Sequence, residues 1–113
     1  MKVDRREIGG IVVVTVTAPV EIDLGNAEEF KKAVIAAVGG ARRVVLDVSL
    51  VEFFDSAGMS SLLSVQKRVA VSEGRLALVG LNRAIQDVFR MVGFDAVFET
   101  HADVPQALEA LKD

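Results

Sequence analysis

The segment RRVVLDVSLVEFFDSAGMSSLL, residues 42–63, passes from a strand-like pattern to a helix-like one. Residues 42–49 are β-branched and apolar at nearly consecutive positions, which is typical of a short strand covered on both faces near the centre of a sheet. From the polar motif at residues 55–58 to residues 72–74, apolar side chains recur at helical spacing instead. The inward face of this helix is expected to carry Met59, Leu62, Leu63, Val69 and Ala70.

Further strand-like runs lie on both sides of this segment. Gly9 and Gly10 separate the first two runs and tolerate the positive φ angles of a tight turn, so the chain is expected to open with a β-hairpin. Helical patterns separate the later runs, and strands joined through helical crossovers are expected to run parallel. These runs are residues 2–8, 11–17, 75–81 and 96–100.

Three further helices are predicted from capping signals and apolar periodicity. Asn26 with Glu29 forms an approximate capping pair, Asn82 is a candidate N-cap, and Asp103 precedes a helix with Pro105 in its first turn. The glycines expected to end helices are Gly39, Gly40 and Gly93. The expected inward residues are Ala27, Phe30, Val34, Ala37, Val38, Ile85, Val88, Phe89, Val92, Ala107, Leu108 and Leu111.

The predicted order ββαβαβαβα is that of an α/β fold. It combines an N-terminal β-hairpin with a mixed, mostly parallel sheet of about five strands and about four helices. The chain has 113 residues, of which 51% are hydrophobic and 26% charged, and this is enough for one continuous core. We therefore expect a single domain spanning residues 1–113.

Composition argues against several classes of partner and site. The net charge of −3 arises from interspersed acids and bases without a basic stripe, which disfavours nucleic acid. No apolar run of 18 residues is present, so no membrane span is expected, and the charged N-terminus lacks a secretory signal pattern. The sequence has no cysteine, which excludes disulfides and thiol chemistry. A cytoplasmic location is expected.

The motif Asp55-Ser56-Ala57-Gly58 holds more polar residues than a helix start requires. Ser56 lies at or beside the first helical residue, where unpaired N–H groups meet the positive end of the helix dipole. The simplest alternative is an N-cap, which stabilises a helix by about 1 kcal/mol. Glycine within the first turn costs about 1 kcal/mol relative to alanine, which suggests that another backbone approaches the Ser56 hydroxyl closely.

Residues 44–63, VVLDVSLVEFFDSAGMSSLL, closely resemble the strand, loop and helix of STAS domains, specifically bacterial anti-sigma factor antagonists. Residues 21–34, EIDLGNAEEFKKAV, resemble the Glu-Leu-Asp segment and first helix of that family. Residues 92–111 are similar to its usual C-terminal stretch. In the family, the serine directly after the aspartate of the motif is phosphorylated, and this serine corresponds to Ser56.

The resemblance implies a switch in a partner-exchange pathway. The unphosphorylated antagonist is expected to bind an anti-sigma factor, which is also a serine kinase, and so to free the sigma factor. The kinase would phosphorylate Ser56 and lose affinity for the product, and a PP2C-type phosphatase would restore the binding form. No catalysis by the chain itself and no cofactor are expected. The partner surface implied by the resemblance comprises Glu21, Asp23, Asp55, Ser56, Ala57, Gly58 and Met59.

Two kinds of chemical site were weighed against this interpretation. An enzyme would use Ser56 as nucleophile, Asp55 nearby and His101 as base, but the sequence has no G-x-S-x-G elbow, and His101 is expected to be a solvated residue. A metal site would need converging carboxylates, whereas Asp23, Asp47 and Asp55 are isolated in the sequence. We expect Asp47 to accept a hydrogen bond from a backbone or hydroxyl donor at the end of its strand.

Two non-catalytic relatives of the same fold stay open as alternatives, because fold alone does not fix function. One is a scaffold subunit of a large stress-signalling assembly, and the other is a STAS accessory protein of a lipid or anion transporter. The phosphorylatable serine disfavours the transporter class, and the lack of an N-terminal sensor domain disfavours the sensing scaffold.

Overall fold

The computed structural model describes residues 1–112 and confirms the α/β class. A 3-10 helix at Phe94–Ala96 precedes the last strand. In chain order the strands and helices are β1 (Val3–Ile8), β2 (Ile11–Val16), β3 (Val20–Ile22), α1 (Ala27–Val38), β4 (Arg43–Asp47), β5 (Val51–Phe54), α2 (Ser56–Val71), β6 (Arg75–Val79), α3 (Arg83–Val92), β7 (Glu99–His101) and α4 (Val104–Leu111).

The main sheet is mixed, with the strand order β1-β2-β4-β6-β7. Strand β1 is antiparallel to β2, while β2, β4, β6 and β7 run parallel to one another. Gly9 and Gly10 have φ angles of 58° and 79°, which confirms the predicted hairpin turn. Strand β4 is central, and its residues Val44, Val45 and Leu46 are fully buried, as their continuous apolar pattern predicts.

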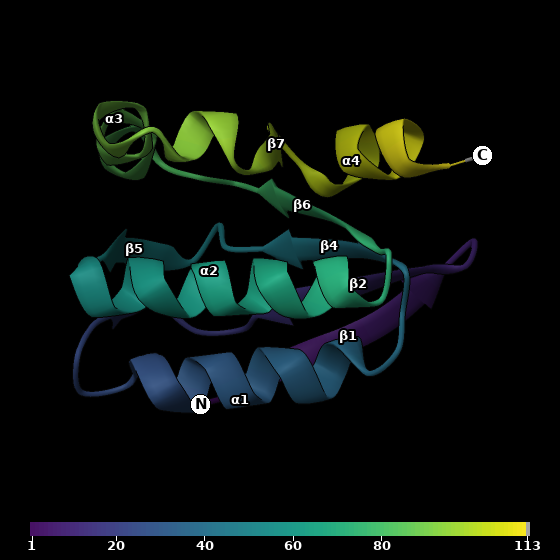
Figure 1. The fold of residues 1–113 in the computed structure, drawn as a ribbon, viewed down its shortest axis with the longest axis horizontal. Coiled ribbons are helices and arrows are strands. Elements are labelled where there is room, and N and C mark those ends of the chain that lie inside the picture. Colours follow the sequence, from purple (N-terminus) through teal and green to yellow (C-terminus); the bar gives the residue numbers. More distant parts are fainter. Residues whose placement is uncertain (113) are drawn as a thin grey trace.

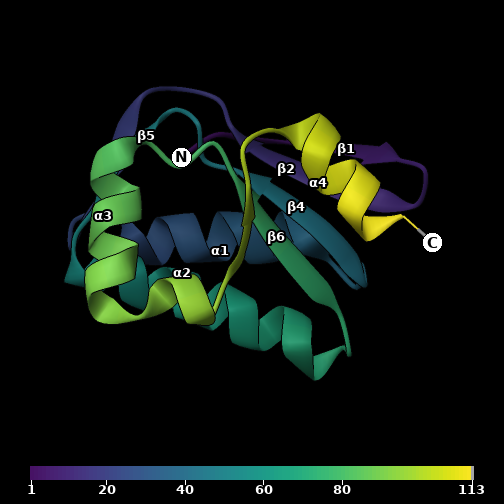
Figure 2. The ribbon, with the colours of Figure 1, turned by 90° about the horizontal axis from the view of Figure 1, so that it is seen from above.

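Helices cover both faces of this sheet (Figure 2). On one side, α1 and α2 pack over a core that includes Val12 and Val14 of β2 and Leu46 of β4. On the other side, α4 packs over a smaller apolar cluster that includes Val13 and Val45. Successive strand residues thus contribute to opposite layers, which is the two-residue periodicity of a β-strand.

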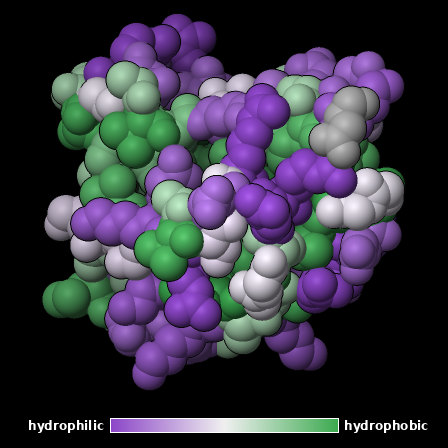
Figure 3. Space-filling model, turned by 45° about the vertical axis from the view of Figure 1, so that its right-hand side comes forward, coloured by the Kyte–Doolittle hydropathy of each residue, from purple (hydrophilic) through white to green (hydrophobic). Residues whose placement is uncertain are grey.

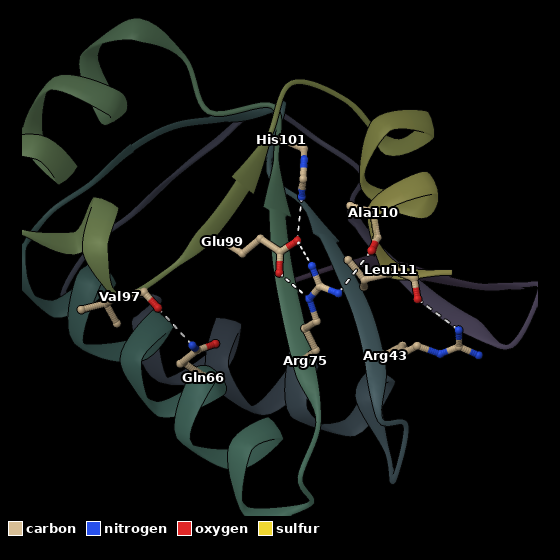
Figure 4. Close-up of polar contacts among 8 residues, drawn as sticks. All are labelled: Arg43, Gln66, Arg75, Val97, Glu99, His101, Ala110 and Leu111. Carbon is tan, nitrogen blue, oxygen red and sulfur yellow. Dashed lines mark hydrogen bonds and ion pairs between the residues drawn. The ribbon is translucent and has the colours of Figure 1, made fainter. Parts of the chain in front are cut away.

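Helix α4 is fastened to the sheet by arginines from two adjacent strands (Figure 4). Arg43 Nη1 donates to the Leu111 carbonyl at 3.1 Å, and Arg75 Nη1 donates to the Ala110 carbonyl at 3.2 Å. Glu99 holds Arg75 through two hydrogen bonds, of 2.7 and 2.8 Å. The positive charges lie at the helix C-terminus, where the negative end of the dipole favours them.

His101 is not the solvated residue that the sequence predicts. It is the last residue of β7, its side chain is 23% exposed, and its Nε2 lies 2.7 Å from Glu99 Oε2. Burial raises the pKa of the Glu99 carboxyl, but hydrogen bonds from Arg75 and His101 and the attraction of both groups outweigh this effect, so the pKa is lowered.

The strands of the structure differ from the prediction in two places. Residues 51–54, which lie between the strand predicted at 42–49 and the polar motif, form β5 and pair in parallel with β3 in a separate two-stranded sheet. The last strand is β7 rather than residues 96–100. Phe94 and Phe98 pack around Phe89, with ring centroids 5.3 to 5.8 Å apart, and Gln66 of α2 donates to the Val97 carbonyl (Figure 4). Residues up to Phe98 belong to this aromatic cluster, and the strand begins after them, at Glu99.

Two of the predicted N-caps are confirmed. Asn82 Oδ1 accepts from Ile85 N at 2.9 Å, and Asp103 Oδ1 accepts from Gln106 N at 3.0 Å. Gly93 ends α3 in the left-handed conformation, with φ 81°, as predicted.

The predicted capping pair of α1 is wrong. Asn26 makes no side-chain bond to the helix; its Oδ1 accepts from Asp23 N at 2.9 Å, and its Nδ2 donates to the Glu21 carbonyl at 2.8 Å. The Glu29 carboxylate pairs with the amino group of Met1. Asn26 therefore shapes the loop before the helix, because an amide can donate to one backbone group and accept from another.

The predicted apolar faces are largely correct. Two residues lie outside them: Ala70 is exposed, and Val92 is 51% exposed. Ala70 lies one position beyond the buried stripe of α2, which ends at Val69, and Val92 is the last residue of α3. Among the inward residues, those confirmed as buried are Ala27, Phe30, Val34, Val38, Leu62, Val69, Ile85, Phe89, Ala107 and Leu111.

The surface carries interspersed polar and apolar side chains. On the face shown in Figure 3, polar side chains predominate and apolar ones form small separate groups. No helix within residues 1–112 combines the length and the hydropathy that crossing a membrane requires.

Candidate partner-binding site

The polar motif lies where the small parallel sheet ends. Strands β3 and β5 pair with Ile22 opposite Phe54, so the residues that follow each strand, Asp23 and Asp55, emerge at the same edge. Helices α1 and α2 lie side by side and both begin at this end of the molecule, at the left of Figure 1. Parallel strands gather loop residues at their carboxyl ends in this way.

Asp55 joins these two loops. It is the N-cap of α2, with Oδ1 accepting from Gly58 N at 2.8 Å. Its other oxygen, Oδ2, accepts from Leu24 N at 3.1 Å, and its own N–H donates to the Ile22 carbonyl at 3.0 Å. A single carboxylate thus caps one helix and holds the loop that leads into the other.

Ser56 is the first residue of α2 and is exposed. Asp55 rather than Ser56 is the cap, so the N-cap alternative for Ser56 is wrong. Within residues 1–112 the Ser56 hydroxyl has no hydrogen-bond partner, and neither do the N–H groups of Ser56 and Ala57. The first intrahelical bond runs from Met59 N to the Asp55 carbonyl, at 2.8 Å. Free donors of this kind bind anions at helix N-termini.

Gly58 is buried, and the backbone that approaches it belongs to the chain itself. A Cβ atom on Gly58 would lie 2.4 Å from the carbonyl oxygen of Ile22. The close approach inferred from this glycine therefore exists, but it is made by β3 on the inner side of the helix and not at the Ser56 hydroxyl. Gly58 belongs to the packing beneath the site.

The loop at residues 23–26 is closed by its own hydrogen bonds. Asp23 Oδ1 accepts from Gly25 N at 2.9 Å, and the Asp23 carbonyl accepts from Ala27 N at 2.8 Å. Leu24, at the tip of this loop, is 86% exposed. Sequence reasoning missed Leu24, although an apolar residue between an aspartate and a glycine in a polar loop is a usable signal.

The predicted surface also includes Glu21, Ala57 and Met59. Glu21 is exposed on β3, whereas Ala57 and Met59 are partly buried against the main core. A groove of about 230 Å³ runs between α1 and α2 beside the motif. It is lined by Leu24, Ala27, Glu28, Lys31, Ala57, Ser60, Ser61 and Ser64.

The residues weighed for an enzyme or a metal site make other contacts in this structure. His101 contacts Glu99, and no hydrogen bond within residues 1–112 joins it to Ser56. In the described part of the chain, no three potential ligands among histidine, cysteine, aspartate and glutamate converge to hold a metal ion. Asp47 Oδ1 accepts from Ser49 N at 3.0 Å, which confirms its predicted role at the end of a strand.

Comparisons with known proteins agree with this architecture. A family model described as STAS domain matches residues 2–107. A Bordetella bronchiseptica protein named "Putative anti-sigma factor antagonist BtrV" is 31% identical over 113 residues, covering 99% of this chain and 96% of that protein. The crystal structure of an anti-sigma factor antagonist from Mycobacterium paratuberculosis is similar, with a TM-score of 0.84 at 26% identity, covering 99% of this chain and 94% of the other.

The same fold also occurs inside a much larger protein. The murine anion transporter Solute Carrier 26 family member A9 matches 93% of this chain with 18% of its own, at a TM-score of 0.79 and 24% identity, a likeness of fold alone. The family match and the Bordetella relative, by contrast, extend over almost the full length of the chain. The chain therefore belongs to the STAS domain family, in the group of bacterial anti-sigma factor antagonists.

Proposed function

We propose that this chain is the phosphorylation-controlled switch of a partner-exchange pathway in the cytoplasm. In the unphosphorylated form it binds an anti-sigma factor, which is also a serine kinase, and thereby releases a sigma factor. Phosphorylation of Ser56 by that kinase ends the binding, and a PP2C-type phosphatase restores it. The chain acts by binding and uses no cofactor of its own.

The observation that carries the proposal is the state of Ser56. Its hydroxyl is exposed and makes no hydrogen bond within residues 1–112, although it stands at the start of a 16-residue helix with unpaired N–H groups beside it. A phosphate there is favoured within its own chain by the helix N-terminus. We therefore expect phosphorylation to leave the stability of the fold almost unchanged and to weaken the complex with the partner.

The proposed partner surface explains why the complex bears that cost. The proposed surface carries three carboxylates: Glu21 lies on β3, and Asp23 and Asp55 directly follow β3 and β5. Phosphate adds a charge of about −1.5 to −2 beside Asp55, and a partner packed against Ser56 would have to desolvate it. We expect the affinity to fall by orders of magnitude while the stability of the fold barely changes.

Ser56→Ala and Ser56→Asp test the switch. Ser56→Ala should bind the purified anti-sigma factor kinase of the source organism constitutively and resist phosphorylation. Ser56→Asp should bind poorly and yet melt near the wild type. Calorimetric binding and thermal unfolding of each variant are both needed, because lost binding alone also follows from lost structure. Tight binding of Ser56→Asp, or failure only through unfolding, would contradict the mechanism.

Neighbouring serines supply internal controls for the phosphorylation site. The Ser61 hydroxyl is buried and donates to the Gly58 carbonyl at 2.6 Å, and the Ser64 hydroxyl donates to the Ser60 carbonyl at 3.3 Å. Ser60 is exposed but lies a full turn inside the helix, so a kinase would have to unwind α2 to extend it. Phosphopeptide mass spectrometry should find the modification on Ser56 alone, and a main product at another serine would overturn this assignment.

Asp23 tests the extent of the surface. Asp23→Ala removes both a carboxylate and the bond that closes the loop at Gly25, so kinase affinity and phosphorylation rate should both fall. If both are unchanged, the partner surface lies elsewhere.

A transporter accessory protein is the second candidate, because the same fold occurs in an anion transporter. A scaffold subunit of a stress-signalling assembly is the other alternative. Pull-down from the native cell separates these possibilities. Recovery of a small ATPase-like kinase supports the switch, whereas recovery of a transporter subunit or a megadalton complex contradicts it.

A further inference from the structure

Leu24 presents a large apolar side chain to solvent beside the phosphorylatable serine. Its side chain is 86% exposed, and its backbone N–H is held by the carboxylate that also caps the helix of Ser56. An isolated exposed leucine needs no explanation, but a leucine fixed at the edge of a partner surface does.

The loop that carries Leu24 is ordered by hydrogen bonds on every side. Asp23 and Gly25, its two neighbours, are joined by a bond of 2.9 Å, and Asn26 bonds both Asp23 N and the Glu21 carbonyl. Little backbone freedom is left to lose when a partner binds, so the side chain is presented at a low entropic cost.

Asp55 links this loop to the switch residue. Its Oδ2 holds Leu24 N at 3.1 Å, while its Oδ1 holds Gly58 N at 2.8 Å. The Asp55 side chain thus links the loop of Leu24 to the start of the helix that carries Ser56.

We propose that Leu24 is the apolar anchor of the interface with the anti-sigma factor kinase, and that Asp55 is the residue that positions it. This inference rests on the proposed function. The partner would then offer an apolar pocket for one leucine side chain, with a cationic group at its rim to match the exposed carboxylate of Glu21. Phosphate on Ser56 acts by keeping that pocket from closing over Leu24.

The groove between α1 and α2 extends the same surface. Leu24 lies at its edge, and Ala27 and Ala57 supply small apolar walls, while Lys31 is paired with Glu28 at 3.0 Å. A pocket rim of the partner that closes over Leu24 therefore meets small side chains behind it. Central anchors flanked by small, water-excluding contacts are typical of binding hot spots.

Leu24→Ala is the direct test, with Val71→Ala as the matched control. Val71 is 82% exposed at the last residue of α2, about 22 Å along the helix from Ser56. Calorimetric titration with the purified anti-sigma factor kinase should show that Leu24→Ala loses about 10- to 100-fold in affinity, that Leu24→Met retains the affinity within about threefold, and that Val71→Ala is unchanged. All three should melt within a few degrees of wild type, because neither side chain is buried.

Asp55→Asn tests the positioning role separately. Asparagine keeps the capping oxygen for Gly58 N but replaces the second acceptor by an NH₂ donor, so the bond to Leu24 N is lost while the cap stays. We expect faster hydrogen exchange at the Leu24 amide and an affinity loss of about 3- to 10-fold, with the protection of residues inside α2 unchanged. Unchanged exchange at Leu24 would refute the positioning role.

The outcomes separate this inference from the function on which it rests. If the wild type binds none of the anti-sigma factor kinases of its genome, the proposed function fails, and the inference fails with it. If the wild type binds and Leu24→Ala binds equally well, the anchor alone is refuted. Equal losses in Leu24→Ala and Val71→Ala also refute it, because the effect is then not local to the loop.

Discussion

Gly58→Ala is expected to destabilise the protein although alanine is the better helix former. The added Cβ would lie 2.4 Å from the Ile22 carbonyl oxygen, about 1 Å closer than contact allows. That oxygen accepts the Asp55 N–H at 3.0 Å, so moving β3 away from α2 stretches the bond that holds the start of the helix.

The size of the effect follows from three contributions. Overpacking costs about 1 to 3 kcal/mol, and loss of the hydrogen bond to Ile22 costs about 1 kcal/mol. The higher helix propensity of alanine returns about 1 kcal/mol. The net loss is about 1 to 3 kcal/mol, which lowers the melting temperature by about 4 to 12 °C for a domain of this size.

Thermal unfolding measured by circular dichroism checks this estimate, with Gly40→Ala as the control. A Cβ on Gly40 meets nothing within 4 Å, and its φ is not positive, so Gly40→Ala should be neutral or stabilising by up to about 1 kcal/mol. A Gly58→Ala variant as stable as wild type would show that β3 and α2 separate freely, and the reasoning on Gly58 would be wrong.

Two further predictions concern stability. The pKa of Glu99 is lowered in the fold, so its pairing with Arg75 and His101 stabilises the protein at pH values above 4.5, the ordinary pKa of a glutamate. This contribution to stability is lost as the pH falls through the pKa of Glu99 in the folded state. The difference in melting temperature between wild type and Glu99→Gln should therefore shrink from pH 7 to pH 3, and a constant difference would contradict the linkage. Asn82→Ala should cost about 1 kcal/mol or more in urea unfolding, since it removes the cap of α3 and the 2.9 Å bond to the Glu52 carbonyl, whereas Asn82→Asp keeps the cap and should cost less.

Local signals of the sequence predict much of the fold. The glycines at 9 and 10, the caps Asn82 and Asp103, and the continuous apolar run of β4 each have one dominant interpretation, and each is confirmed. Asn26 was misassigned because its amide had several possible partners, and the loop at Asp23 and Glu21 offered better ones than the helix did. Capping propensity alone does not resolve such competition.

Sequence patterns did not predict the small sheet formed by β3 and β5. Both strands are short, at three and four residues, and their pairing joins segments that α1 and β4 separate in the chain. The exposure of Leu24 depends on this pairing, since the loop leaves β3 at the point where Asp55 leaves β5. Long-range pairs of this kind are set by tertiary packing, which local propensity does not encode.

The motif at residues 55–58 contains residues that hold the fold together and a residue that is free for modification. Asp55 is used by the cap and by Leu24 N, and Gly58 by the approach of β3, so neither is free to change without disturbing the fold. Within the motif, Ser56 has an exposed hydroxyl that makes no hydrogen bond to any group of residues 1–112. A phosphate on Ser56 therefore breaks no hydrogen bond of the hydroxyl, and the unpaired N–H groups of Ser56 and Ala57 lie beside it. Phosphorylation is thus expected to change the charge of this surface without changing the fold. It follows that substitutions at Gly58, and those at Asp55 that remove the cap, change stability as well as binding, whereas substitutions at Ser56 and Leu24 report binding alone.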